Sequence, residues 1–213
     1  MPYIPNLASP SNDIFDKSFD ALIEEINRCS ELGIRYIVTH IGSHTGSGVV
    51  MGKTRLIQAL GRAVDEEGPM ILLENSSGSG DQMGSRLNEL AEITKVIGGT
   101  RIGICFDTCH AFAAGYDIAS KEGLNATMRE ITRTVGFSRL KLVHLNDSFG
   151  ELGSRIDHHE HIGLGKIGQD GFRQILASQL SKRPLIIETP IDDKRSDIDN
   201  MKKVYELAGV NRQ

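Results

Sequence analysis

Five short apolar stretches of the chain each end in a side chain that can bind a metal ion. They are Ile37–His40, Ile71–Glu74, Ile104–Asp107, Leu142–His144 and Ile186–Glu188. Their last residues lie 34, 33, 37 and 44 positions apart, which is room for one strand, one helix and two loops. In a barrel of parallel strands, the C-terminal strand ends meet on one face. Two His, two Glu and one Asp brought together there are predicted to form a metal cage.

Further residues of the same kind lie near these strand ends. His110 follows the third strand end by three positions, and residues 157–161 form the polar run DHHEH. Asp157 and His159 are two apart, so an extended backbone points both to one side and His158 to the other. A solvated histidine run that binds metal only incidentally is the plainer interpretation. The whole set supplies four carboxylates and four histidines, and clustered metal ions suit phosphoryl transfer because they activate water and hold both reacting oxygens.

Strand and helix patterns alternate along the chain. A leading helix is expected after the turn-rich N-terminal residues, with Gly33 placed to end it. Strands are predicted near 34–40, 70–75, 101–108, 140–146 and 184–189, and helices near 53–67, 85–97, 123–135, 170–180 and 195–208. This alternation is typical of a parallel α/β fold. We predict a single domain over residues 1–213 of the TIM (β/α)8-barrel type, incomplete, with about five parallel strands and six helices, since a full barrel has eight strands in about 250 residues.

The composition indicates a globular protein. A chain of 213 residues can form one sizeable core, and no apolar run approaches the roughly 18 residues of a membrane span. The first residues have no basic segment and no apolar core, so no signal peptide is expected. Three cysteines form no disulfide framework, which favours the reducing cytoplasm. The net charge of −4 argues weakly against a wide nucleic-acid surface, although bound divalent ions would add positive charge at one place.

The sequence resembles the endonuclease IV family of zinc-dependent apurinic/apyrimidinic-site endonucleases. The matching segments are Tyr3–Pro10, His40–His44, Glu74–Gly78, Cys105–Asp117, His144–Ser148, Asp157–Gly163 and Glu188–Pro190. They run from one end of the chain to the other. The resemblance implies a TIM-barrel hydrolase that cleaves double-stranded DNA 5′ to an abasic site and also trims blocked 3′ ends, with a metal-bound hydroxide as the nucleophile.

The resemblance also implies up to three zinc ions and their ligands. One zinc would be bound by His40 and Glu74. Glu74 would bridge to the second zinc, whose other ligands would be Asp107, His144 and Glu188. The third zinc would be bound by His110, Asp157 and His159. Glu74 and Glu188 are the predicted catalytic residues. Tyr3, Ile4 and Asn6 are the predicted DNA-binding residues, because the family inserts side chains from this segment at the lesion.

Two other interpretations stay open beside this one. A sugar isomerase or epimerase on a similar barrel would use Glu74, Asp107, His144 and Glu188 around one metal ion, and would leave the other ligand-type residues without a purpose. A non-catalytic metal- or DNA-binding fragment is the third interpretation. The family has another zinc-ligand histidine at a position before Met1, so the first zinc site is expected to be weakened and the chain to be a poor, self-associating enzyme, whereas the intact family is monomeric.

Overall fold

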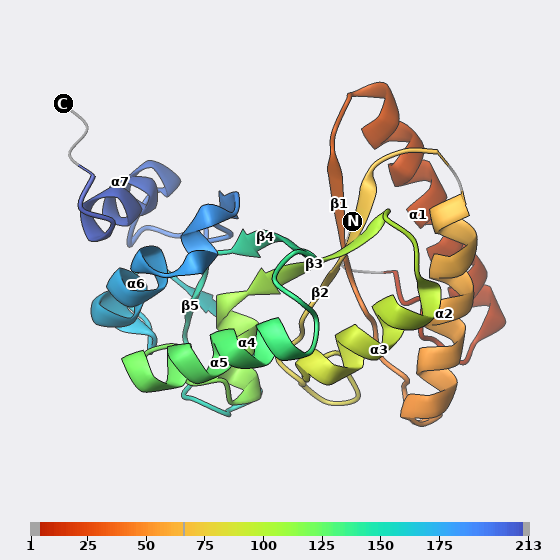
Figure 1. Cartoon of the computed structure of the whole chain (residues 1–213), viewed down its shortest axis with the longest axis horizontal. Coiled ribbons are helices and arrows are strands. Elements are labelled where there is room, and N and C mark those ends of the chain that lie inside the picture. Colours follow the sequence, from red (N-terminus) through yellow and green to blue (C-terminus); the bar gives the residue numbers. More distant parts are fainter. Residues whose placement is uncertain (1–4, 66, 211–213) are drawn as a thin grey trace. The chain divides into compact units, whose positions relative to one another are not determined.

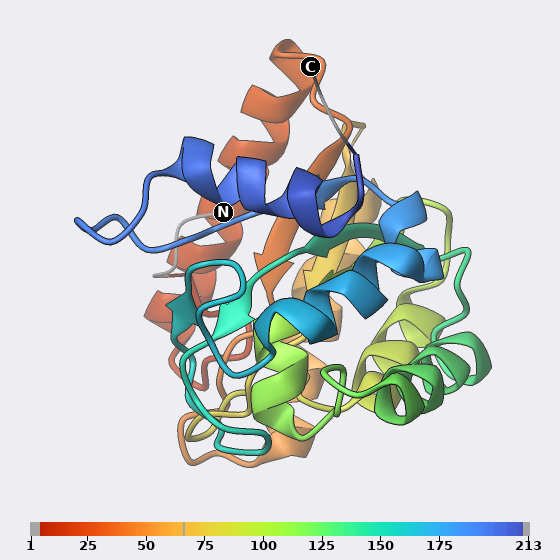
Figure 2. The same cartoon turned by 90° about the vertical axis from the view of Figure 1, so that its left-hand side faces the viewer.

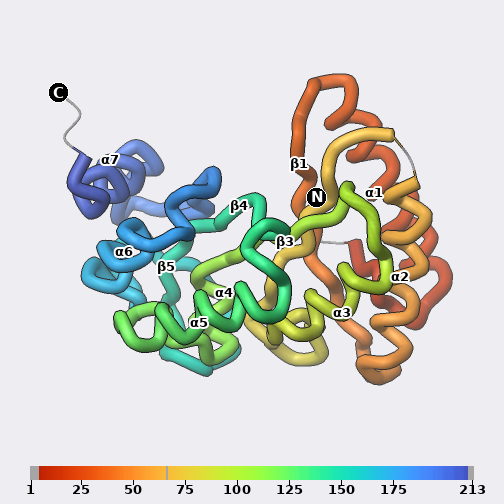
Figure 3. The backbone as a smooth tube through the Cα atoms, viewed as in Figure 1, coloured from red at the N-terminus to blue at the C-terminus, as the bar shows by residue number. Residues whose placement is uncertain are grey.

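The structure is a computed structural model that describes residues 5–65 and 67–210. The described residues form two compact units. The first extends to Ser76 and resumes over Gly80–Cys105, and the second comprises Ser77–Ser79 and the chain from Phe106 onward. The path of the backbone alternates strand and helix through both units (Figure 3). That alternation was predicted from the sequence, whereas the expectation of a single domain stays a prediction.

The first unit is built on three parallel strands, β1 (Tyr36–His40), β2 (Met70–Glu74) and β3 (Ile102–Asp107), whose last two residues belong to the second unit. β2 lies between the other two, and its residues pair in register with both. His40 is the partner of Glu74 across β1 and β2, and Cys105 is the partner of Glu74 across β2 and β3. The strand pairing therefore places these three side chains at one end of the sheet.

Helices α1 (Asn12–Glu31), α2 (Val49–Asp65) and α3 (Leu87–Ile97) belong to the same unit and cover one face of its strands (Figure 1). The helix α1 begins where the Ser11 side chain accepts the Ile14 backbone N–H. Leu22 and Ile26, four residues apart, are fully buried, as the apolar spacing predicts. The helix ends before Gly33, whose φ of +64° suits glycine and stops the helix.

The second unit contains two strand pairs and four α-helices. The strands β4 (Leu140–His144) and β7 (Leu185–Ile186) are parallel, and β5 (Asp147–Ser148) and β6 (His159–Glu160) are antiparallel. The helices are α4 (Thr108–Ala114), α5 (Lys121–Arg133), α6 (Gly168–Ala177) and α7 (Asp197–Leu207), with a 3₁₀ turn η1 (Gln179–Lys182) after α6. Successive helices from α5 to α7 lie next to one another (Figure 2). Among the described residues, no helix is long and apolar enough to cross a membrane.

Two elements differ from the sequence prediction. The helix α4 lies where a loop was expected, because Asp107 ends β3 and at once accepts the His110 backbone N–H at 2.7 Å as a helix cap. It raises the predicted six α-helices to seven in the described chain. The strand expected near 184–189 pairs with β4 over Leu185–Ile186 only. The pairing ends there because the Glu188 backbone N–H donates to Asn146 Oδ1 at 2.8 Å and not to a backbone oxygen of β4. The five parallel strands agree with the prediction.

Candidate metal centre

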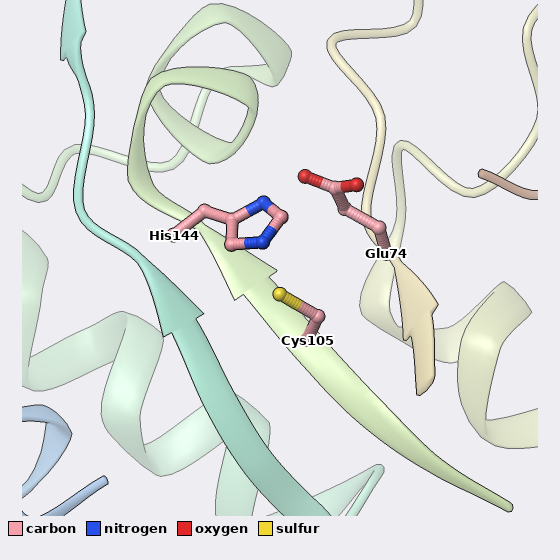
Figure 4. A group of neighbouring side chains, drawn as sticks. All are labelled: Glu74, Cys105 and His144. Carbon is pink, nitrogen blue, oxygen red and sulfur yellow. The ribbon is translucent and has the colours of Figure 1, made fainter. Parts of the chain in front are cut away.

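In the first unit, His40 and Glu74 are the last residues of two neighbouring strands. Because they are register partners, His40 Nδ1 lies 3.7 Å from Glu74 Oε2. The Glu74 side chain is 4% exposed and that of His40 is 36% exposed, so the pair lies at the edge of the core. Figure 4 shows the Glu74 side chain at the end of β2 beside the Cys105 side chain on the neighbouring strand β3. An imidazole and a buried carboxylate in this arrangement are suitable ligands for a divalent metal ion.

Asn6 organises the loop that follows β1. Its Oδ1 accepts the Ser43 backbone N–H at 3.0 Å, and its amide nitrogen donates to Ser43 O at 2.8 Å. Gly42 makes this contact possible, because a Cβ there would lie 2.3 Å from Asn6 Oδ1. Asn6 and His40 also line a cavity of about 180 Å³. The structure therefore gives Asn6 a role within the protein, while its predicted contact with DNA stays a prediction; Tyr3 and Ile4 lie outside the described residues.

In the second unit, Asn146 ties together two carboxylates of the predicted ligand set. Its amide nitrogen donates to Asp107 Oδ2 at 2.6 Å and to Glu188 Oε2 at 3.1 Å. His144 Nδ1 lies 3.1 Å from Glu188 Oε2 and 3.9 Å from Asp107 Oδ2. The structure thus brings Asp107, His144 and Glu188 together around one amide. Sequence reasoning gave Asn146 no role, although it follows His144 by two positions and so faces the same side of an extended segment.

Glu188 is held as a carboxylate by these neighbours. Burial alone would raise the pKa of its carboxyl, but the hydrogen bond and positive charge of His144 and the amide of Asn146 outweigh burial and lower the pKa to about 2. The side chain is 46% exposed. An ionised, reachable carboxylate beside an imidazole is the form in which Glu binds a metal ion.

His110, Asp157 and His159 form a second group in this unit. Each offers one ligand atom, and the three atoms lie within 4.8 Å of one another. His110 Nε2 is 3.0 Å from Asp157 Oδ1, and the rings of His110 and His159 are 5.5 Å apart between centroids. His158 lies outside this group, because its ring stacks on Phe149 at 4.9 Å. The structure therefore separates His158 from its two neighbours in the way that the two-residue spacing predicts.

The two nitrogens of His159 have different surroundings. Nδ1 lies 2.9 Å from the backbone oxygen of Glu188, which only accepts hydrogen bonds, so Nδ1 carries the proton and Nε2 has the lone pair. Nε2 is buried and makes no hydrogen bond within residues 5–65 and 67–210. A buried polar atom without a hydrogen bond is costly, and a metal ion bound by His110, Asp157 and His159 would satisfy it. The donors present therefore fit a metal ion.

Cys109 lies close to the same residues but differs from them in charge. Its Sγ is near ligand atoms of Asp107 and His159, and it donates to His158 O at 3.6 Å. Burial, with the charge of Asp107 second, raises the pKa of the Cys109 thiol far above its usual value. The buried thiol donates its proton to a backbone oxygen, which agrees with the packing role that the sequence suggested for Cys109. The bridging role predicted for Glu74 involves residues of both units and stays a prediction.

Comparisons with known proteins identify the family of the chain. Residues 1–207 match the family described as xylose isomerase-like TIM barrel. A probable endonuclease 4 of Methanoculleus marisnigri is 52% identical over 215 residues, which cover 99% of this chain and 76% of the relative. A probable endonuclease 4 of Thermosipho melanesiensis is 45% identical over 213 residues, 99% of this chain and 75% of the relative.

Solved structures lead to the same family. The crystal structure of endonuclease IV from Thermus thermophilus has a TM-score of 0.80 and 35% identity, and the match covers 98% of this chain and 72% of that one. A D-tagatose 3-epimerase-like protein has a TM-score of 0.71 at 21% identity, over 98% of this chain and 76% of that one, and shows the barrel fold alone. The predicted resemblance and fold class are confirmed, and the chain belongs to the endonuclease IV family of xylose isomerase-like TIM barrels.

Proposed function

We propose that this chain is a metal-dependent DNA-repair endonuclease that cleaves double-stranded DNA 5′ to abasic sites and trims blocked 3′ ends. Its relatives are named endonuclease 4 and endonuclease IV, which supports a nuclease that acts on DNA. The observation that carries the proposal is the group of His110, Asp157 and His159, with the buried Nε2 of His159 turned away from the hydrogen bond that fixes its ring.

Zinc is the metal that this donor set suits best, because it accepts imidazole nitrogen and carboxylate oxygen together. One ion would be held by His110, Asp157 and His159. Another would take Asp107, His144 and Glu188 as ligands, which are already gathered around one amide group in the second unit. The His40–Glu74 pair of the first unit supplies ligands for a third ion. Bound zinc supplies activation of water and neutralisation of phosphate charge.

The protein's own groups orient these ligands. Asn146 holds the Asp107 and Glu188 carboxylates, and the Glu188 backbone oxygen fixes the ring of His159. Outer hydrogen bonds of this kind set the tautomer and the direction of a ligand, and their loss weakens metal binding. The arrangement therefore prepares the ligands before any metal ion or DNA arrives.

Cleavage of a DNA duplex with one abasic site tests the proposal. We expect nicking on the 5′ side of the lesion, its loss on treatment with a chelator, and its return when zinc is added. Glu74→Gln and His144→Ala should each remove the activity while the far-ultraviolet circular dichroism stays unchanged. His158→Ala is the matched control and should keep the activity, because its ring stacks on Phe149.

The same assay can contradict the proposal. Metal-free protein that nicks abasic DNA at the untreated rate would show that the ligand residues do not carry the reaction. Equal nicking of intact and abasic duplexes would contradict the proposed substrate. Wild-type protein that releases about one zinc per chain and no more would favour a single-metal centre of the isomerase kind.

A further inference from the structure

A network of polar side chains joins the segments that carry His159 and Glu188 to helix α7. Its centre is His161, whose side chain is fully buried in the segment that leads from β6 towards α6. His161 Nε2 lies 2.8 Å from Asp192 Oδ1, and His161 Nδ1 lies 2.9 Å from the amide nitrogen of Asn200 on α7. The same amide nitrogen is 3.1 Å from Thr189 Oγ1. The network thus joins three segments of the second unit.

The hydrogen-bond donors in this network are determined by chemistry. Asn200 Oδ1 accepts the backbone N–H of Ile162 at 3.2 Å, so the other end of its amide is the nitrogen that faces His161. Since that nitrogen donates, His161 Nδ1 must accept and Nε2 must carry the proton. Nε2 then donates to the carboxylate of Asp192, whose pKa is lowered chiefly by this bond. Both ring nitrogens and both ends of the Asn200 amide have partners.

The network contacts the chain next to two predicted metal ligands. His161 follows His159 by two residues, and Thr189 follows Glu188 by one. His159 Nδ1 and the Glu188 backbone oxygen are 2.9 Å apart, so these two segments must keep a fixed distance for the His159 ring to keep its direction. Asn200 bonds to both segments, through Ile162 and His161 on one side and Thr189 on the other.

We propose that the His161–Asp192–Asn200 network is a positioning device that holds His159 and Glu188 in the geometry that binds metal. This inference rests on the proposed function, in which both residues are metal ligands. His161, Asp192 and Asn200 bind no metal themselves. They act through the backbone of the segments they join, and their loss lets the two segments move apart.

Metal release from the Co²⁺-loaded chain tests this role without an activity assay. Excess chelator is mixed with the loaded protein, and the decay of the visible Co²⁺ absorption gives the release rate. We expect Asn200→Leu to speed release of the fast-leaving ion by about 10- to 100-fold and to change the absorption bands, because it strips the amide from both segments. His161→Leu should act in the same direction.

Two further variants separate hydrogen bonding from packing. His161→Gln has an amide that can both donate to Asp192 and accept from Asn200, so it should restore release to within about threefold of wild type. Val204→Ala removes apolar packing from the same helix as Asn200 and takes no hydrogen-bonding side chain from the network, so it should lower the melting temperature and leave release within about twofold. Asp192→Ala alters a partly exposed side chain, and should speed release about threefold.

The outcomes distinguish this inference from the proposed function. A wild-type chain that binds no Co²⁺ contradicts the proposed function and the positioning role with it. Wild-type binding with unchanged release from Asp192→Ala and from both Leu variants overturns the positioning role alone. If the Leu variants do not fold, the comparison of Asp192→Ala with Val204→Ala still decides, because an Asp192→Ala chain that releases metal no faster than the Val204→Ala chain contradicts the role.

Discussion

His40 and Glu74 in the first unit lie level with each other because β1 and β2 are paired in register up to their last residues. In the second unit, Asp107 and Glu188 are held by a side chain, since the amide of Asn146 bonds to both carboxylates. Backbone pairing places the first set, and buried side-chain hydrogen bonds place the second. The difference teaches that the second set can be disrupted through residues that bind no metal, whereas the first depends on the sheet itself.

The largest expected effect comes from removing a ligand of the second unit. His159→Ala should lose about one metal ion per chain, because it deletes the buried Nε2 that has no hydrogen bond in the described chain. His158→Ala is its neighbour in sequence and should keep the full content, since its ring stacks on Phe149. Elemental analysis after dialysis measures both. The opposite result for the two variants would place the ligand at 158 and contradict the account.

A smaller loss is expected from Asn146→Leu, which keeps the size of the side chain and removes its hydrogen bonds. Metal affinity should fall by about 10- to 100-fold, because Asp107 and Glu188 lose the group that orients them. Thr39→Val is the matched control in the first unit, because it removes the side-chain hydrogen bond from Thr39 Oγ1 to the His40 backbone oxygen. Metal affinity should stay within about twofold of wild type, since the pairing of β1 with β2 still places His40 and Glu74. Competition with a calibrated chelator gives both values. Equal losses would show that the two units do not hold their ligands differently.

Stability offers a third test, in the segment of the second unit between β5 and α6. The buried Asp147 carboxylate accepts backbone N–H groups of Ser148, Gly163, Gly165 and Ile167 at 2.8 to 3.0 Å. Asp147→Asn turns one acceptor into a donor that faces these groups, and should lower the free energy of unfolding by about 2 kcal/mol. The exposed Asp193→Asn is the control and should change it by less than about 0.5 kcal/mol. Urea unfolding of metal-free protein measures both; similar midpoints would refute the role given to Asp147.

The smallest effect is a pH dependence of the metal-free protein. The pKa of Glu188 is about 2 in the folded chain, and an unfolded Glu titrates near about 4.3. Its contribution to stability is therefore present above about pH 4.3 and is lost as the pH falls towards about 2. The difference in melting temperature between wild type and Glu188→Gln should be largest near about pH 5 and shrink on acidification. A difference that grows as the pH falls would contradict the ionised state of Glu188.

The strand-end ligands are the part of the site that the sequence predicts well. His40, Glu74, Asp107 and His144 are the last residues of β1 to β4, because a run of apolar residues followed by a polar one marks where a buried strand leaves the core. Glu188 was predicted to end a strand as well, but it follows β7 by two residues. The apolar pattern predicts where the strand lies but not where its backbone pairing ends. Here the pairing with β4 ends at Ile186, and the Asn146 side chain accepts the Glu188 backbone N–H instead.

The side-chain networks could not be predicted in the same way. Asn146, His161 and Asn200 act through partners that are distant in sequence, and no spacing marks such a pair. Helix α4 was missed for a related reason, since its start depends on a cap by Asp107, which the sequence had already assigned to metal binding. Local patterns predict elements, whereas buried polar pairing is decided only when the elements pack.

X-ray absorption at the zinc K-edge tests the central claim most directly, because it reports which atoms surround the metal. The account predicts only nitrogen and oxygen neighbours at about 2.0–2.2 Å, with the outer scattering of imidazole rings. Cys109 lies close to Asp107 and His159, so a thiolate ligand would be seen if it bound. A sulfur shell at about 2.3 Å, or a chain that takes up no zinc, would contradict a centre built from histidine and carboxylate.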